Sequence, residues 1–159
     1  MSESANWPAP EIANGDPTKY AGFFMRVLAH ICDGLNSLIL VLPLSIIGGL
    51  ISEDGVAGAA VTGVISLAGM ALQSHWIGTR GGSPLRVKVG ALVVDQETGA
   101  YIGMSRAFVR TFAATAFALP VAINPGFIVI ALLDILWMLR DPQRQTLHDK
   151  IARTVVQQS

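Results

Sequence analysis

The chain has 159 residues, of which 52% are hydrophobic and only 14% are charged. A water-soluble domain is usually about a quarter charged, so this composition excludes a conventional globular surface. The formal net charge is zero, which provides no basic field for nucleic acid, and we expect no nucleic-acid partner.

Residues 1–19 contain three prolines and scattered polar groups, which predicts a disordered cytoplasmic tail. One transmembrane domain is expected over residues 20–157. Its first two apolar stretches, at about residues 22–50 and 56–77, each supply the roughly 20 residues that cross a hydrocarbon core of about 30 Å. The first is too long for a cleaved signal peptide and has no Ala-x-Ala site before a soluble domain.

A third apolar stretch is divided by Pro120 and by the turn sequence Asn124-Pro125-Gly126. Proline removes a helical donor and Asn-Pro-Gly favours a turn, so two helices are predicted at about residues 106–122 and 127–140. The predicted fold class is therefore an all-α integral membrane protein with four short transmembrane helices. The last helix is short for a full span, which leaves a re-entrant pair as the alternative.

The 11 basic residues lie near the start of the first helix, in or just after the middle loop at residues 78–105, and after the fourth helix. The other two connections, residues 52–55 and 122–125, contain none. Because lysine and arginine favour cytoplasmic loops, this pattern predicts that both termini and the middle loop are cytoplasmic. The expected location is a bacterial inner (plasma) membrane, with several passes.

The middle loop has an order of its own. Apolar and basic residues alternate at residues 85–89, and the apolar run continues through residues 91–94. Turn-forming residues 95–99 then precede residues 100–102, so a small cytoplasmic hairpin on the membrane surface is predicted. Residues 154–156 are a further pairing partner for it.

The informative chemistry lies in the first helix, where Arg26, His30, Asp33 and Ser37 share one face. A carboxylate at the depth of Asp33 costs roughly 2.5 to 3.5 kcal/mol, so it needs a partner. Arg26, His30 and Arg110 are the candidates. These three residues and Asp33 are the predicted ligand or ion pathway.

Other residues are expected to have ordinary roles. Arg86 and Lys88 are interpreted as topology-setting charges, with contact to lipid phosphates as the alternative. The single cysteine, Cys32, is interpreted as a small apolar filler. The three histidines lie on separate segments, so no metal site is expected. With no P-loop, nucleotide fingerprint or nucleophile elbow, we expect neither an enzyme nor a cofactor.

Together these segments resemble the RDD family of bacterial and archaeal membrane proteins. The resemblance covers about residues 19–157 and is carried by Arg26, Asp33, the loop at residues 83–95, Arg110 and above all residues 144–156. Within that last segment the family signature is Arg144, Gln145, Thr146, His148 and Asp149. The sequence departs from the family at Pro84-Leu85-Arg86, where Pro-Gly-Lys is commoner, and at Arg153, where glycine is frequent.

The resemblance implies that Arg26, Asp33 and Asp149 are the one arginine and two aspartates for which the family is named. It also implies a role in transport, which has been proposed for its members. Asp149 is expected to accept hydrogen bonds from a basic group or from the middle loop, which would tie the tail to the cytoplasmic face. The alternative is a plain helix N-terminal cap.

Two classes of function remain open from the sequence. In one, Asp33 and its partners bind a cation or proton that the protein, or a transporter containing it, moves across the membrane. In the other, the protein is an accessory or scaffold protein whose buried charges are structural. Four short helices leave little room for a pathway, so besides the lipid bilayer we expect a homo-oligomer or a membrane protein partner.

Overall fold

A computed structural model describes residues 19–51 and 55–158 of the chain. The predicted disordered tail, except for its last residue, lies outside the described residues. The helices of the described part are α1 (Phe23–Ile51), α2 (Gly55–Arg80), α3 (Pro84–Lys88), α4 (Gly103–Ile123), α5 (Ile128–Leu136) and α6 (Leu147–Ala152). Two 3-10 turns, Pro125–Phe127 and Trp137–Leu139, flank α5, and two strands, β1 (Ala91–Asp95) and β2 (Thr154–Gln158), complete the fold.

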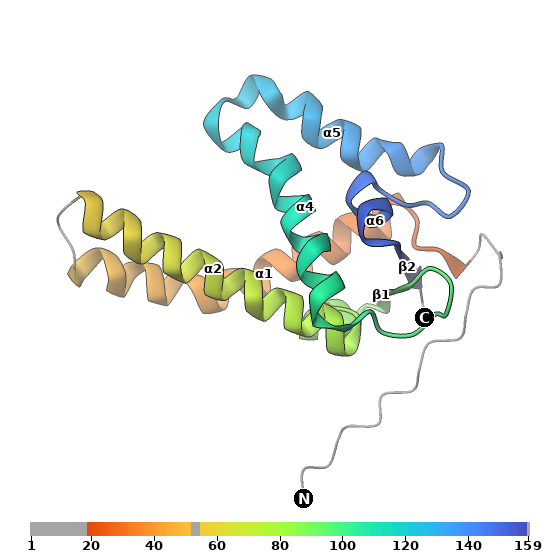
Figure 1. The fold of residues 1–159 in the computed structure, drawn as a ribbon, viewed down its shortest axis with the longest axis horizontal. Coiled ribbons are helices and arrows are strands. Elements are labelled where there is room, and N and C mark those ends of the chain that lie inside the picture. Colours follow the sequence, from red (N-terminus) through yellow and green to blue (C-terminus); the bar gives the residue numbers. More distant parts are fainter. Residues whose placement is uncertain (1–18, 52–54, 159) are drawn as a thin grey trace, which may run out of the picture.

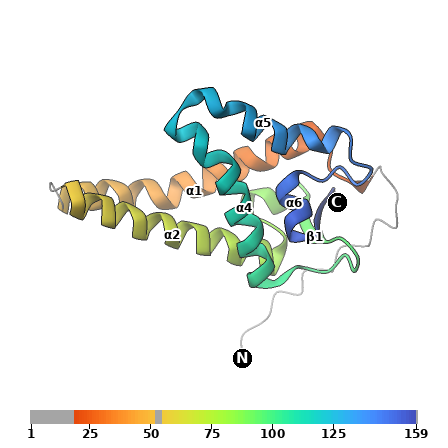
Figure 2. The ribbon, with the colours of Figure 1, turned by 45° about the horizontal axis from the view of Figure 1, so that its top comes forward.

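The two longest helices, α1 and α2, lie side by side as an antiparallel hairpin along the long axis of the molecule (Figures 1 and 2). Within the described ranges, the segments Phe23–Gly48 and Gly55–Lys88 are long and apolar enough to cross a membrane. The apolar segment Pro125–Leu139 is shorter. Helices therefore form close to all four predicted ranges, but only the first two meet this combined criterion of length and apolar composition.

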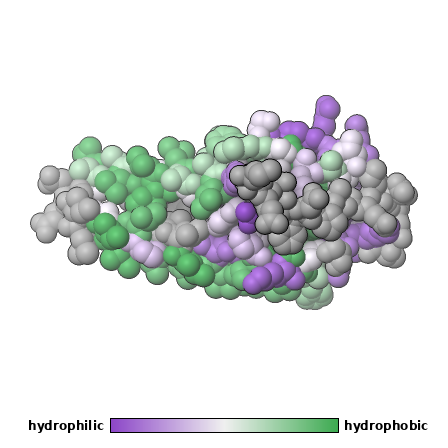
Figure 3. Space-filling view, turned by 90° about the horizontal axis from the view of Figure 1, so that it is seen from below, coloured by the Kyte–Doolittle hydropathy of each residue, from purple (hydrophilic) through white to green (hydrophobic). Residues whose placement is uncertain are grey.

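The apolar side chains of these helices point outward to an unusual extent. Phe24 of α1 is 85% exposed, Val56 and Val64 of α2 are 86% and 67% exposed, and Leu133 of α5 is 58% exposed. Figure 3 shows this hydrophobic surface over the α1–α2 hairpin, with the hydrophilic residues gathered toward the other end of the molecule. An apolar surface of this extent requires a cover other than water, and lipid chains suit it.

The polar end is built from short elements, α3, α6, β1 and β2, which we refer to together as the polar cap. β1 and β2 form a two-stranded antiparallel sheet in which Val93 faces Val156. The predicted pairing of the middle loop with residues 154–156 is therefore confirmed. The prediction that two segments of the middle loop pair with each other as a hairpin was wrong, because β1 pairs with β2 instead.

The strand predicted at residues 85–89 was also wrong, because this segment forms α3. Ser83 caps that helix, and its hydroxyl accepts a hydrogen bond from the Arg86 backbone nitrogen at 3.4 Å. Pro84 occupies the first turn, where its missing N–H costs nothing. A cap and a proline at the correct spacing therefore prevail over the alternating pattern of apolar and basic residues.

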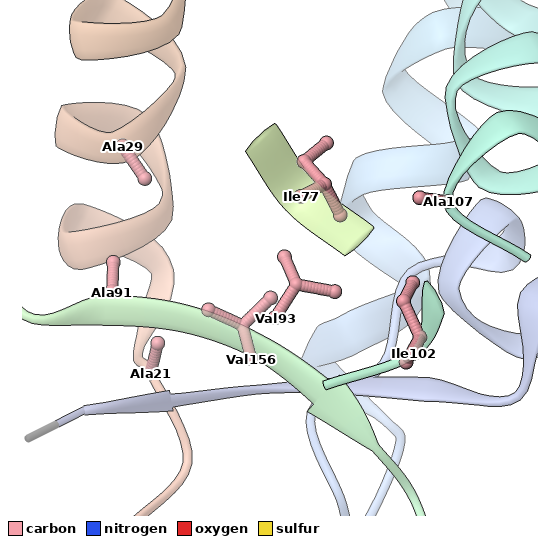
Figure 4. Packing of buried hydrophobic residues seen from close by; sticks show 8 residues of the cluster. All are labelled: Ala21, Ala29, Ile77, Ala91, Val93, Ile102, Ala107 and Val156. Carbon is pink, nitrogen blue, oxygen red and sulfur yellow. The ribbon is translucent and has the colours of Figure 1, made fainter. Parts of the chain in front are cut away.

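A small apolar core joins the polar cap to the helices (Figure 4). It is made of eight residues from α1, α2, α4, both strands and the segments before α1 and α4: Ala21, Ala29, Ile77, Ala91, Val93, Ile102, Ala107 and Val156. Next to it, a Cβ on Gly78 would lie 2.6 Å from the carbonyl carbon of Gly103. Only glycine allows this approach, which fixes the start of α4 against α2.

Candidate functional site

Asp149 is a fully buried carboxylate where α1, α4 and α6 meet. Its Oδ2 lies 2.5 Å from Arg26 Nη1, and its Oδ1 lies 2.8 Å from Arg110 Nη2. Burial alone would raise the pKa of Asp149, but the guanidinium groups of Arg110 and Arg26 hold that pKa well below its usual range. The group is therefore an anion shared by two cations from two helices.

The same aspartate also starts α6. The Thr146 hydroxyl accepts a hydrogen bond from the Asp149 backbone nitrogen, while the Asp149 carboxylate accepts one from the Thr146 nitrogen, each at 3.3 Å. This reciprocal pair is a capping box. Both alternatives for Asp149, a bond to basic groups and a helix cap, are thus present in one side chain.

Asp33 has a different partner from those expected. Its Oδ2 lies 2.8 Å from Arg86 Nη1, and Arg86 Nε also donates to the Ala91 carbonyl oxygen at 2.8 Å. The predicted pairing with Arg26, His30 or Arg110 was wrong, because Arg26 and Arg110 bind Asp149 instead. Contact of Arg86 with lipid phosphates, the alternative from the sequence, was wrong as well, since the side chain is 2% exposed.

A third pair, Asp134 with His148, has no counterpart in the sequence analysis. Asp134 Oδ2 lies 2.7 Å from His148 Nδ1, and Oδ1 accepts from the His148 backbone nitrogen at 3.0 Å. The contact joins the C-terminal part of α5 to α6. Its signal in the sequence is that Asp134 is the one charged residue in the apolar stretch of residues 127–139.

These groups border a cavity of about 690 Å³ between α1, α2, α4 and α5. Polar side chains in its wall are His30, Asp33, Ser37, Gln73, Arg110, Thr111, Thr115, Asp134 and His148. The cavity thus brings together three of the four predicted pathway residues. The fourth, Arg26, is bound to Asp149 outside its wall.

The sequence of the chain matches the model of the RDD family over residues 20–153. The chain belongs to the RDD family. No curated protein and no solved structure matches it. Because RDD proteins are membrane proteins, the exposed apolar surface of α1 and α2 is the surface that meets lipid.

The ion pairs Arg26–Asp149 and Asp33–Arg86 both contain residues for which the RDD family is named. The resemblance assigns the name-giving residues of an RDD protein to Arg26, Asp33 and Asp149. In this RDD protein, Arg26 and Asp149 bind each other, whereas Asp33 binds Arg86. The family signature thus ties α1 to the polar cap at two places, once through α6 and once through α3.

Arg144 and Gln145, two further signature residues, hold the C-terminal segment of the RDD protein in place. Arg144 Nη1 donates to the Tyr20 carbonyl oxygen at 3.3 Å. Gln145 Nε2 donates to the Thr154 carbonyl oxygen at 2.8 Å and to Gln96 Oε1 at 3.0 Å. These contacts place the segment around Arg144 and Gln145 against the residues before α1 and against β2.

A further ion pair lies at the outer side of the polar cap, where Arg106 bonds Asp95. Burial raises the pKa of Asp95, but hydrogen bonds from the Thr98 backbone, Arg106 and the Glu97 backbone lower it to about 2. Cys32 is buried and free, in agreement with its interpretation as a filler. The described residues contain no group of three or more His, Cys, Asp or Glu side chains that could hold a metal ion.

Proposed function

We propose that this RDD protein moves a cation or proton across the membrane, alone or as a component of a transporter, and that Asp33 binds it from the cavity. The observation that carries the proposal is the second oxygen of the Asp33 carboxylate. Oδ1 is buried and has no hydrogen-bond partner among the described residues, while Asp33 lines the cavity of about 690 Å³.

The physical argument starts from the cost of such an atom. The side chains of Ser83 and Gln73 approach the Asp33 carboxylate as hydrogen-bond donors, but Oδ1 has no partner at ordinary hydrogen-bond geometry. Leaving a buried acceptor unpaired costs about 1–3 kcal/mol. An ionisable group inside a membrane is also expensive and marks pathways for ions and protons. A cation or proton that binds Oδ1 removes this cost, which makes Asp33 the natural binding group.

The alternative, an accessory or scaffold protein, has its own supporting observation. Arg26 and Arg110 both bind Asp149, and Arg86 binds Asp33, so the charges in the interior compensate one another. Such a network is sufficient to lock α1 and α4 to the polar cap without any transported ion. We favour transport because a purely structural role of the buried charges would leave the cavity and the unpaired Asp33 oxygen without a function.

We further propose that the protein lies in a bacterial inner membrane with its polar cap and both termini in the cytoplasm. α1 and α2 cross the membrane, whereas α4 and α5 enter from the cytoplasmic side and return. The part of α4 that follows Arg110 has only 13 residues, up to Ile123. At 1.5 Å per residue it extends about 20 Å, which is too short for a hydrocarbon core of about 30 Å. The α4–α5 turn also lies part-way along the α1–α2 hairpin in Figures 1 and 2.

Thiol labelling tests this topology. Asn124→Cys and Asp54→Cys are introduced separately into a Cys32→Ser background and treated in intact cells with a membrane-impermeant maleimide. A re-entrant pair predicts that position 54 reacts from outside and that position 124 does not. Glu97→Cys should react only after the membrane is opened, which controls for the cytoplasmic side. Equal outside labelling of positions 54 and 124 would instead establish four full spans.

Ion flux in vesicles of purified protein tests the function. Asp33→Asn should reduce gradient-driven flux of alkali cations or protons to the background of empty vesicles, because an amide neither titrates nor neutralises a cation. The matched control is Glu97→Gln, the same loss of one carboxylate at an exposed position, which should keep wild-type flux. Full flux in Asp33→Asn would eliminate this mechanism and leave the accessory function.

A further inference from the structure

The size and walls of the cavity restrict the class of ligand that it can hold. Small-molecule sites in proteins usually measure about 300–1,000 Å³, and this cavity, at about 690 Å³, lies within that range. A monatomic ion would occupy a small part of it. Apolar side chains from four helices line it, among them Val27, Ile77, Phe117 and Ile135. The walls therefore match a molecule with an apolar body.

The cavity is also open toward the apolar outer surface. Ile31 and Gly34 of α1, and Thr115 and Ala118 of α4, line it and are at the same time exposed. This side of the molecule is formed by the helices that meet lipid. An amphiphilic molecule dissolved in the bilayer could thus reach the cavity from the side, with its polar group directed toward Asp33.

The unpaired polar atoms call for a hydrogen-bond donor. Within the described ranges, the buried side-chain atoms without a partner are two acceptors, Asp33 Oδ1 and Gln73 Oε1. The hydroxyls of Thr111 and Thr115 already donate to helix carbonyl oxygens at 2.9 Å. Because both acceptors are shielded from solvent, ligand entry requires the Gln73 side chain to turn. An ammonium group offers three donors, enough for both acceptors.

The charges of the wall point the same way. Asp33 and Asp134 contribute two carboxylates to it, of which Asp33 is paired through one oxygen with Arg86. Arg110 contributes one guanidinium, which is bound to Asp149. A hard cation such as Ca²⁺ takes about six to eight oxygen ligands, whereas one of the two carboxylates of this wall, Asp134, is already bound to His148. An organic cation needs no such ligand cage.

We propose that the ligand of this cavity is an organic ammonium ion with an apolar body, an inference that rests on the proposed binding of a transported cation at Asp33. The ammonium group donates to Asp33 Oδ1 and Gln73 Oε1. The apolar body lies against Val27, Ile31 and Phe117. This assignment separates the protein from one that binds only a proton or a bare alkali ion.

Equilibrium binding to the purified full-length protein tests the assignment without transport. The probes share one apolar body and differ in the head group: 1-adamantylammonium, 1-adamantanol and 1-adamantanecarboxylate, with sodium and potassium chloride as ion probes. The ammonium compound should bind at least about tenfold more tightly than the alcohol or the carboxylate by calorimetry, a difference equal to one decade in the binding constant. Equal binding of the alcohol would overturn the ammonium assignment.

Variants locate the binding site. Gln73→Met removes one acceptor and keeps both members of the Asp33–Arg86 pair, although Asp33 loses its neighbouring amide. It should fold and weaken ammonium binding at least about tenfold. Thr115→Val, a matched change in the same wall of a hydroxyl that already has a partner, should bind like the wild type. Unchanged binding in Gln73→Met would place the ammonium group elsewhere and overturn the inference.

The binding and flux experiments can refute the ligand class and the proposed transport independently of each other. Ammonium binding without flux of any ion or amine would support this inference and refute the proposed transport. Flux of sodium, potassium or protons that adamantylammonium neither binds to nor inhibits would support transport and refute the ligand class. Competition between the ammonium probe and the transported ion at Asp33 would support both.

Discussion

Asp149→Asn is expected to lower the free energy of unfolding by about 3–5 kcal/mol, the usual cost of removing one partner from a buried ion pair. The reason is that Arg26 and Arg110 both lose their counter-charge in positions where each is only 4% exposed. An asparagine keeps the size of the side chain and one acceptor oxygen. It cannot neutralise two guanidinium groups.

The loss should be visible as a lower apparent melting temperature of the detergent-solubilised protein, measured by size-exclusion chromatography after heating. At about 2–4 °C per kcal/mol for a chain of this size, the expected decrease is on the order of 10 °C. Glu97→Gln is the matched control, since its side chain is exposed, and it should stay within about 0.5 kcal/mol. An unchanged melting temperature and protein level in Asp149→Asn would refute the role of Asp149 as a tether.

The pH dependence of stability follows from the same carboxylate. The pKa of Asp149 in the folded protein lies well below its usual value because of Arg110 and Arg26, although burial opposes them. A lowered folded-state pKa gives stability that is present above the unfolded value of about 3.9 and is lost as the pH falls toward the folded value. As the pH falls below about 4, the wild type should therefore lose more stability than Asp149→Asn. Parallel curves of stability against pH for the two proteins would contradict this.

Arg86→Leu is expected to be nearly as damaging, since it leaves Asp33 as a buried charge without its cation and costs about 3–5 kcal/mol. Asp33→Leu/Arg86→Leu should recover most of that loss, because replacing both partners of a buried pair by apolar residues is often neutral or stabilising. The Arg86 hydrogen bond to the Ala91 carbonyl stays missing, at about 0.5–1.5 kcal/mol, as do the contacts of Ser83 and Gln73 with the Asp33 carboxylate. The amount of membrane-inserted protein and its melting temperature measure this cycle.

The double variant also separates the two functions. If Asp33 binds the transported cation, the double variant inserts and folds but has no flux above empty vesicles. If the pair is only structural, its flux or accessory activity matches the wild type. Lys88→Leu is the control for loss of a basic residue on the same helix, because Lys88 is exposed, and it should leave both stability and flux unchanged. A double variant as unstable as Arg86→Leu would show that the damage does not come from the unpaired charge.

The sequence by itself determined the four apolar helices of this protein and its family, but not the short helices α3 and α6. Apolar runs of this length have few alternatives, and Asn124-Pro125-Gly126 separates α4 from α5 by local chemistry. The predicted break at Pro120 was wrong, because α4 continues through Pro120 to Ile123. The resemblance in residues 144–156 identified the family because a signature of this kind is read directly from the order of residues. The importance of Asp33 also followed from sequence, since a carboxylate inside an apolar helix is costly wherever that helix lies.

Only the tertiary structure decided which charges meet. Helical spacing placed Arg26, His30 and Asp33 on one face, yet Arg26 binds a residue 123 positions away and Asp33 binds one 53 positions away. Arg86 reached Asp33 because the Ser83 cap and Pro84 turned a predicted strand into α3, and Asp134 reached His148 because α5 folds back onto α6. Ion pairing depends on distances of a few ångströms between segments that are remote in sequence, and periodicity along one helix carries no information about those distances.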